Sequence, residues 1–234
     1  MTKPVCLITG VGDGTGAALA RRFAKGGYQV AMLARNRDRL ARLEKEIADA
    51  KAYVCDTSDL EALVATVESV CAEMGVPSVL VHNAVSATFK TFLEADPEDL
   101  ERNFRVNTTS LLYLARALAP DMVAAGHGAI MVTGNTAALR GIPKYAVFAP
   151  TKAAQRILAQ SLARDLGPKG VHVAYITIDA AIDTPWTRDA FNRDKPDVFF
   201  SNPADIADEL FHVAHQARST WSFDVEIRPY GEKW

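Results

Sequence analysis

The sequence TGVGDGTG, residues 9–16, decides the fold of this 234-residue chain. It comes directly after Val5–Thr9, a short apolar run, and before Ala17–Lys25, whose periodicity predicts a helix. Glycines in such a turn let the backbone approach a pyrophosphate, and the start of the following helix offers it free N–H groups. We therefore predict a dinucleotide-binding turn, although a purely structural glycine turn gives the same pattern; the glycines concerned are Gly10, Gly14 and Gly16.

Strands and helices are expected to alternate along the rest of the chain. The apolar runs predict strands at Tyr28–Ala34, Ala52–Cys55, Ser78–His82, Ala129–Thr133, Val171–Ile178 and Ser222–Ile227. The predicted helices are Arg37–Ala48, Leu60–Glu73, a helix from Asp96 to Leu118 that Pro120 disturbs, Pro150–Leu166, and one from Pro203 to about Ala217. Continuously apolar strands alternating with helices indicate a parallel sheet covered on both faces. The predicted fold class is α/β, a doubly wound parallel sheet of the Rossmann type, with residues 1–234 forming one domain.

Composition and charge narrow the classes of partner. The net charge is -2, hydrophobic residues make up 49% and charged residues 23%, and the basic residues are scattered. This distribution argues against a nucleic-acid groove or a polybasic membrane patch. No apolar run approaches the roughly 20 residues of a membrane span, and the glycine turn comes too early for a signal peptide. We expect a cytoplasmic protein that acts on a small-molecule substrate.

The chain has three cysteines, Cys6, Cys55 and Cys71. Their spacing fits no metal-binding knuckle, and an odd number argues against a disulfide framework. Cys6 and Cys55 lie within apolar runs, where a cysteine behaves as a small core residue. No metal site is expected.

The glycine turn has the TGxxxGxG spacing, and with it the chain resembles the short-chain dehydrogenase/reductase family over nearly its whole length. The resemblance implies an oxidoreductase that binds a nicotinamide dinucleotide. It also implies a homodimer or homotetramer packed through the helices that contain Asn107 and Lys152. At the positions matching the family's motifs, the implied cofactor contacts are Asp56 and Thr57 after the third strand, Asn83 and Ala84 after the fourth, Lys152, and Ile182 and Thr184 after the sixth.

The sequence departs from the family where the chemistry is expected. Phe148 stands four residues before Lys152, where most of the family has the tyrosine that transfers the substrate proton, and a phenyl ring cannot transfer one. Asn135 falls at the position of the family's catalytic serine, and Val85 and His82 replace a glycine and an asparagine beside Asn83. His82 has no partner at metal-ligand spacing, so it is expected to be structural.

Tyr145 is the candidate replacement for the missing tyrosine. Six residues separate it from Lys152, a spacing similar to that of the bacterial enoyl-acyl-carrier-protein reductases, a divergent branch of the same fold. On one unbroken helix the two side chains would lie roughly 10 Å apart along the axis. Pro150 instead favours a helix that begins near residue 149, which leaves Tyr145 in the preceding loop. A packing or rim role for Tyr145 stays open.

The end of the second predicted strand bears on the choice of dinucleotide. An acid there pairs with the ribose hydroxyls of NAD, whereas a basic side chain accepts the 2′-phosphate of NADP. Ala34 stands at the acid's position and Arg35 follows it, which favours NADP(H). Asp13 argues the other way, because its charge opposes a nearby phosphate, so NAD remains possible.

We therefore expect hydride transfer between NADP(H) and a small carbonyl or alcohol substrate. The proposed catalytic group is Asn107, Asn135, Tyr145 and Lys152. Two alternatives stay open, an enoyl-thioester reductase-like activity and a catalytically silent NADP(H)-binding sensor or partner protein. The resemblance implies that Pro185–Phe200 shapes the substrate pocket, but the substrate itself cannot be deduced from these residues.

Overall fold

A sheet of seven parallel strands forms the centre of the computed structural model within the residues it describes, 2–191 and 194–231. The strand order is β3-β2-β1-β4-β5-β6-β9. The strands are β1 (Val5–Thr9), β2 (Gln29–Ala34), β3 (Ala50–Val54), β4 (Pro77–His82), β5 (Gly128–Gly134), β6 (Val171–Ile178) and β9 (Asp224–Ile227). The predicted doubly wound fold is confirmed, and the last strand is two residues shorter at its start than predicted.

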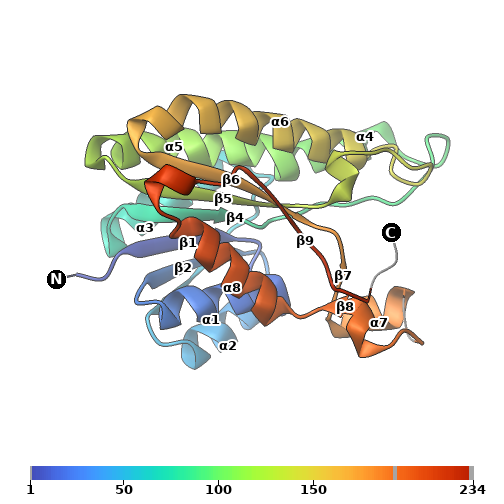
Figure 1. Cartoon of the computed structure of the whole chain (residues 1–234), viewed down its shortest axis with the longest axis horizontal. Helices are drawn as coiled ribbons and strands as arrows, with labels where there is room; N and C mark the ends of the chain where they lie inside the picture. Colours follow the sequence, from blue (N-terminus) through green and yellow to red (C-terminus); the bar gives the residue numbers. More distant parts are fainter. Residues whose placement is uncertain (1, 192–193, 232–234) are drawn as a thin grey trace.

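Helices cover both faces of the sheet (Figure 1). On one face lie α1 (Thr15–Lys25), α2 (Arg37–Glu46) and α8 (Pro203–Ala214). The other face carries α3 (Leu60–Met74), α4 (Pro97–Phe104), α5 (Ser110–Ala125) and α6 (Ala149–Leu166). Among the described residues, no helix combines the length and the apolar character that a membrane crossing requires.

The core consists of two apolar layers, one on each face of the sheet. Alternate side chains of β1 enter opposite layers: Leu7 packs with the helices α3, α5 and α6, whereas Cys6 and Ile8 pack with α1, α2 and α8. Full burial of a side chain of this size contributes about 1.5–3 kcal/mol. Cys6 and Cys55 are buried, as predicted, and all three cysteines are free thiols.

The strand order reverses between β1 and β4. After β1 the chain adds β2 and β3 toward one edge of the sheet, and after β4 it adds β5 and β6 toward the other edge. The two strand ends are joined there, because Thr9 Oγ1 accepts hydrogen bonds of 3.2 Å from the main-chain N–H groups of both Asn83 and Ala84. In open α/β sheets, ligands bind outside the carboxyl ends of the strands at such a reversal. The fold therefore places the ligand site next to Thr9.

The long helix predicted from Asp96 to Leu118 is wrong in two respects. It is interrupted by a π-helical turn, Arg105–Thr109, between α4 and α5, and it continues past Pro120 to Ala125. Pro120 does not end α5 because the buried face extends beyond it: Leu118 and Met122, on either side, are both in the core. Packing of that face outweighs the loss of one hydrogen bond at the proline.

A second, small sheet that the sequence did not predict lies at the carboxyl-end edge of the main sheet, on the right in Figure 1. It pairs β7 (Ala181–Ile182) with β8 (Phe200–Ser201), and α7 (Pro185–Phe191) lies between these strands in the sequence. The turns of 3-10 helix are Thr136–Ala138, Gly167–Lys169, Asp197–Phe199 and Arg218–Thr220. The segment from β7 to β8 thus stands over the edge where the ligand site is expected.

Candidate functional site

The glycine turn admits no side chain at two of its positions. Gly10 has a φ of 70°, and a Cβ there would lie 2.6 Å from Ala84 Cα. A Cβ on Gly16 would lie 2.6 Å from the carbonyl oxygen of Gly10. Because backbone atoms stand in the way in both cases, the two glycines allow β1, α1 and the end of β4 to approach closely.

The N-terminus of α1 has the features of a phosphate site. Its cap residue, Gly14, has no side chain to bind the helical N–H groups, and no acidic residue lies in the first turn. The Thr15 hydroxyl is buried and has no hydrogen-bond partner among the described residues. Unpaired N–H groups and the positive end of the helix dipole attract a phosphate. The turn therefore fits the pyrophosphate of a dinucleotide.

Thr184 meets this turn from the segment that begins at β7. A Cβ on Gly14 would lie 2.7 Å from Thr184 Cγ2. The Thr184 hydroxyl lies 2.8 Å from that of Thr187 and accepts a hydrogen bond of 3.2 Å from the Thr187 N–H, so it holds the start of α7. Ile182 is half-buried in β7, where it pairs with Ser201. The two residues predicted after the sixth strand are thus close to the predicted glycines.

Arg35 and Asp56 meet at the ends of β2 and β3. Arg35 Nη1 lies 3.9 Å from Asp56 Oδ2, and the arginine side chain is 80% exposed. Asp56 Oδ1 accepts hydrogen bonds from the Ser58 N–H, at 2.9 Å, and from the Ser58 hydroxyl, at 2.8 Å. Thr57 between them is buried. The structure brings these predicted adenosine-side residues together and leaves the guanidinium accessible.

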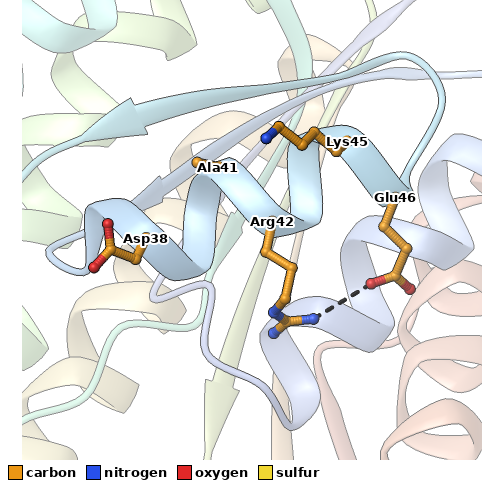
Figure 2. A pocket seen from close by; sticks show the side chains of 5 residues that line it. All are labelled: Asp38, Ala41, Arg42, Lys45 and Glu46. Atoms are coloured by element: carbon orange, nitrogen blue, oxygen red, sulfur yellow. Dashed lines mark hydrogen bonds and ion pairs between the residues drawn. The ribbon is translucent and has the colours of Figure 1, made fainter.

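Asp13 is paired with two arginines of α2. Arg39 Nε donates to Asp13 Oδ2 at 2.7 Å, and Arg42 also contacts Asp13. Figure 2 shows Arg42 in an open hollow along α2, where it also reaches Glu46 at 3.4 Å. From the sequence alone Asp13 was expected to be an isolated charge, and neither arginine was predicted beside it. The two arginines are three residues apart, which places them on one face of a helix, and this spacing could have indicated that they act together.

Asn83 connects three strand ends. Its Nδ2 donates to the carbonyl oxygen of Gly10 at 2.9 Å, and its Oδ1 accepts from the Thr133 hydroxyl at 3.3 Å. The asparagine amide therefore links the ends of β1, β4 and β5. Its neighbour Ala84 is buried against Gly10.

Asn107 is fully buried in the π-helical turn. Its Oδ1 accepts from the Ser86 N–H at 2.9 Å, and its Nδ2 donates to the Ser86 carbonyl and to the Thr151 hydroxyl, both at 2.8 Å. The side chain thus braces the loop after β4 against α6, at the residue next to Lys152.

Lys152 turns its ammonium inward. The side chain is only 2% exposed, and Nζ donates to the Thr133 carbonyl at 3.1 Å and to Gln155 Oε1. Burial lowers the pKa of Lys152 to about 7. Gln155 in turn contacts His82, so two residues that were not predicted at the site form a buried chain that begins at the lysine.

Tyr145 lies in the loop before α6, as predicted, and within an aromatic cluster. Its ring centroid is 5.4 Å from that of Phe89 and 5.7 Å from that of Phe148, which is buried. A β-bridge between Lys90 and Tyr145 ties this loop to the loop after β4. Among the described residues, no hydrogen bond joins the Tyr145 hydroxyl to Lys152.

Asn135 follows β5 directly and caps the short helical turn 136–138. Its Oδ1 accepts from the Ala137 N–H at 3.2 Å. Behind it, a Cβ on Gly134 would overlap the ring of Tyr175, whose buried hydroxyl has no hydrogen-bond partner among the described residues. Asn135 and Lys152 are therefore both positioned by the end of β5.

Comparisons with known proteins place the chain among relatives of the same fold. The family model described as short chain dehydrogenase matches residues 4–195. D-erythrulose reductase of Gallus gallus is 33% identical over 71% of the chain and 67% of its own length, and an uncharacterized oxidoreductase of Staphylococcus saprophyticus is 29% identical over 96% and 97%. The crystal structure of a metagenomic short-chain oxidoreductase in complex with NADP is 28% identical, with a TM-score of 0.86 over 99% of both chains.

Proposed function

The chain belongs to the short-chain dehydrogenase family of oxidoreductases, and on that premise we propose that it transfers hydride between NADP(H) and a small carbonyl or alcohol substrate. The supporting observation is that the bare N-terminus of α1, Asn83 and the buried Lys152 meet at one edge of the sheet. D-erythrulose reductase, the 33% identical relative, takes its name from a carbonyl substrate. That similarity favours carbonyl reduction.

Three observations support NADP(H) over NAD(H). Arg35 extends into solvent beside Asp56, where it can receive a 2′-phosphate. A hydrogen bond to a charged group contributes about 1.5–3 kcal/mol, and at about 1.4 kcal/mol per tenfold this favours NADP(H) by roughly ten- to a hundredfold. The repulsion expected from Asp13 is reduced, because Arg39 and Arg42 pair with its carboxylate. The similar metagenomic oxidoreductase binds NADP.

In this proposal, different residues bind different parts of the cofactor. Gly10, Gly14 and Gly16 accommodate the pyrophosphate, with Ile182 and Thr184 on the other side. Asp56 and Thr57 contact the adenine, Arg35 receives the phosphate, and Asn83 and Ala84 hold the strand ends against the cofactor. When bound, the nicotinamide supplies or accepts the hydride.

Four side chains act at the substrate. Lys152 holds the nicotinamide ribose and presents positive charge to the developing oxyanion. Tyr145 donates the proton or stabilises the oxyanion, from a loop that Phe89 and Phe148 support. Asn135 donates a hydrogen bond to the substrate oxygen, and Asn107 orders a water relay beside Lys152.

Assembly and location are part of the same proposal. We take the chain to be a single domain, residues 1–234, that acts in the cytoplasm as a homodimer or homotetramer. The apolar side chains of Leu112, Tyr113 and Ile157 are exposed on α5 and α6, the helices through which the family resemblance implies packing.

The test is binding followed by turnover. NADPH and NADH are titrated by fluorescence, and NADPH oxidation is then followed with a panel of aldehydes, ketoses and enoyl thioesters. We expect saturable binding that favours NADPH, turnover with at least one carbonyl, and loss of turnover in Lys152→Met but not in Lys144→Met, a change in the loop before α6. Binding without any turnover would instead identify a sensor or partner protein, and no binding of either dinucleotide would overturn the proposal.

The enoyl thioesters are included because the spacing of Tyr145 and Lys152 is similar to that of the enoyl-acyl-carrier-protein reductases. Tyr145 stands in the loop before α6, and six residues separate it from Lys152, so the tyrosine is not held on the same helical face as the lysine. Turnover of enoyl thioesters without turnover of carbonyls would make alkene reduction the function of this site.

A further inference from the structure

A buried chain of four side chains runs from Lys152 into the interior, away from the cofactor edge. Lys152 Nζ donates to Gln155 Oε1, Gln155 Nε2 lies 3.2 Å from His82 Nδ1, and His82 Nε2 lies 2.8 Å from Ser110 Oγ. Ser110 Oγ donates at 2.7 Å to the carbonyl of Val106, in the π-helical turn. His82, Ser110 and Gln155 are fully buried. The chain therefore connects α6, β4 and the start of α5.

While Lys152 is charged, every hydrogen bond in this chain has one possible direction. An ammonium only donates, so Gln155 must present its oxygen to Lys152 and its NH₂ group to His82. His82 Nδ1 must then accept, which places the imidazole proton on Nε2, facing Ser110. Ser110 Oγ accepts the hydrogen bond from Nε2–H and donates its own hydrogen bond to the Val106 carbonyl. Because each orientation forces the next, His82 holds the Gln155 amide with its oxygen toward the lysine.

His82 can serve in this way only as a neutral ring. Burial first, and then the charge of Lys152, lower the pKa of His82 to about 3. A protonated ring would place an N–H at Nδ1 against the NH₂ group of Gln155. His82 therefore remains a neutral acceptor throughout the neutral pH range.

We propose that Gln155 and His82 are positioning residues for Lys152: Gln155 holds the ammonium at the end of β5, and His82 fixes the amide orientation that makes this possible. The proposal rests on the proposed function, in which Lys152 serves the cofactor and the substrate. Four buried polar groups are costly unless all are paired. Here they are all paired, and the chain ends at the ammonium group of Lys152.

The surroundings of Lys152 contain few other charges. On α6 the nearest basic neighbour, Arg156, is paired with Asp224 of β9 at 2.6 Å. Strand β4 contributes His82, and the π-helical turn contributes Asn107, whose neutral amide bonds Thr151 next to Lys152. Gln155 is thus the side-chain acceptor that bears most directly on the charge state of the lysine.

The decisive measurement is the titration of Lys152 itself, followed by ¹³Cε NMR and assigned by the loss of its signal in Lys152→Met. Gln155→Leu removes an acceptor from the ammonium, so we expect the midpoint to fall by on the order of one pH unit. Gln155→Glu adds an opposite charge, and the midpoint is expected to rise by about one to three units. The descending limb of kcat/KM against pH moves with each midpoint.

His82 is tested by a matched pair. His82→Leu removes the acceptor, frees the amide to turn and lowers the midpoint, whereas His82→Asn keeps an acceptor atom near the Nδ1 position and restores it. Gln160→Leu makes the same chemical change as Gln155→Leu on the next turn of α6 and leaves both readouts unchanged. Far-ultraviolet circular dichroism verifies that each variant is folded.

The outcomes separate this proposal from the function it rests on. Unchanged titration of Lys152 in both Gln155 variants, or equal titration in the two His82 variants, overturns the positioning role even if the wild type is a good reductase. Shifted titration in a protein that turns over no substrate supports the positioning role and counts against the proposed function. The NMR readout needs no turnover, so the two can fail independently.

Discussion

The ring of Tyr145 meets the ring of Phe148 edge-on, with 5.7 Å between the ring centroids and 84° between the planes. Phe89 contacts both rings, so the three aromatic side chains form one cluster in front of α6. Phe148, which stands at the position of the family's tyrosine, is thus buried and packs against Tyr145, three residues earlier in the chain. This arrangement gives Tyr145 a fixed place without using its hydroxyl.

Removal of that hydroxyl tests its chemistry separately from its packing. Tyr145→Phe keeps the ring in the cluster, and we expect kcat to fall by about 10²–10⁴-fold, the usual contribution of a positioned proton donor. The dissociation constant for NADPH stays the same. The measurement is steady-state kinetics with the best panel substrate, with Tyr113→Phe on α5 as the control. An unaltered kcat in Tyr145→Phe would leave the tyrosine with a packing role only.

The exposed guanidinium of Arg35 is expected to decide between the two dinucleotides. Arg35→Ala removes a hydrogen-bond donor to the 2′-phosphate, so affinity for NADPH falls roughly ten- to a hundredfold. Affinity for NADH, which lacks that phosphate, changes little. Fluorescence titrations of both dinucleotides measure the ratio, with Arg37→Ala at the start of α2 as the matched control. Equal losses for the two dinucleotides would contradict a role in selection.

Gly134 and Tyr175 make a paired prediction about stability. A Cβ on Gly134 would overlap the Tyr175 ring, so Gly134→Ala is expected to lower the free energy of unfolding by about 1–3 kcal/mol. Tyr175→Phe removes a buried hydroxyl that has no partner among the described residues, and it is expected to be neutral or stabilising. Urea unfolding measures both free energies; a clear loss of stability in Tyr175→Phe would mean that the hydroxyl has a partner.

Burial of Lys152 predicts how stability changes with pH. Its pKa is about 7 in the folded chain, against an ordinary value of 10.5. Between these values the unfolded chain binds more protons, so this group makes the fold more stable as pH rises, by up to about 1.4 kcal/mol per unit. Lys152→Met has no such group. Its advantage in stability over the wild type should therefore be largest at pH 6–7 and shrink toward pH 10.

The measurement is urea unfolding of both proteins at several pH values between 6 and 10. Other titrating groups are common to the two proteins and cancel in the difference. A difference that stays constant over this range would show that Lys152 is not desolvated in the folded chain.

Much of the fold was predictable because its signals are local. The turn at residues 9–16 and the apolar strand runs specify a parallel sheet without any knowledge of distant contacts. The start of α6 also followed from one residue, since Pro150 is favoured in the first turn of a helix. This placed Tyr145 in the preceding loop, where the structure has it.

Distant contacts decided what the sequence did not predict. Pro120 remains inside α5 because both neighbouring turns bury their apolar side chains in the core. His82 was expected to be structural, and its partners Gln155 and Ser110 come from helices far along the chain. No spacing rule relates residues whose meeting depends on the order of strands. The pairing of Asp13 with Arg39 depends in the same way on how α2 packs beside the glycine turn.

The fixed orientation of Gln155 has a consequence for the supply of protons during turnover. A carboxamide does not take up and pass on a proton at neutral pH, so it insulates Lys152 from the imidazole behind it. A proton lost from the lysine is therefore not replaced through Gln155, and must come from the cofactor side or from the water relay proposed at Asn107. Recharging of the site is therefore independent of the imidazole in the protein interior.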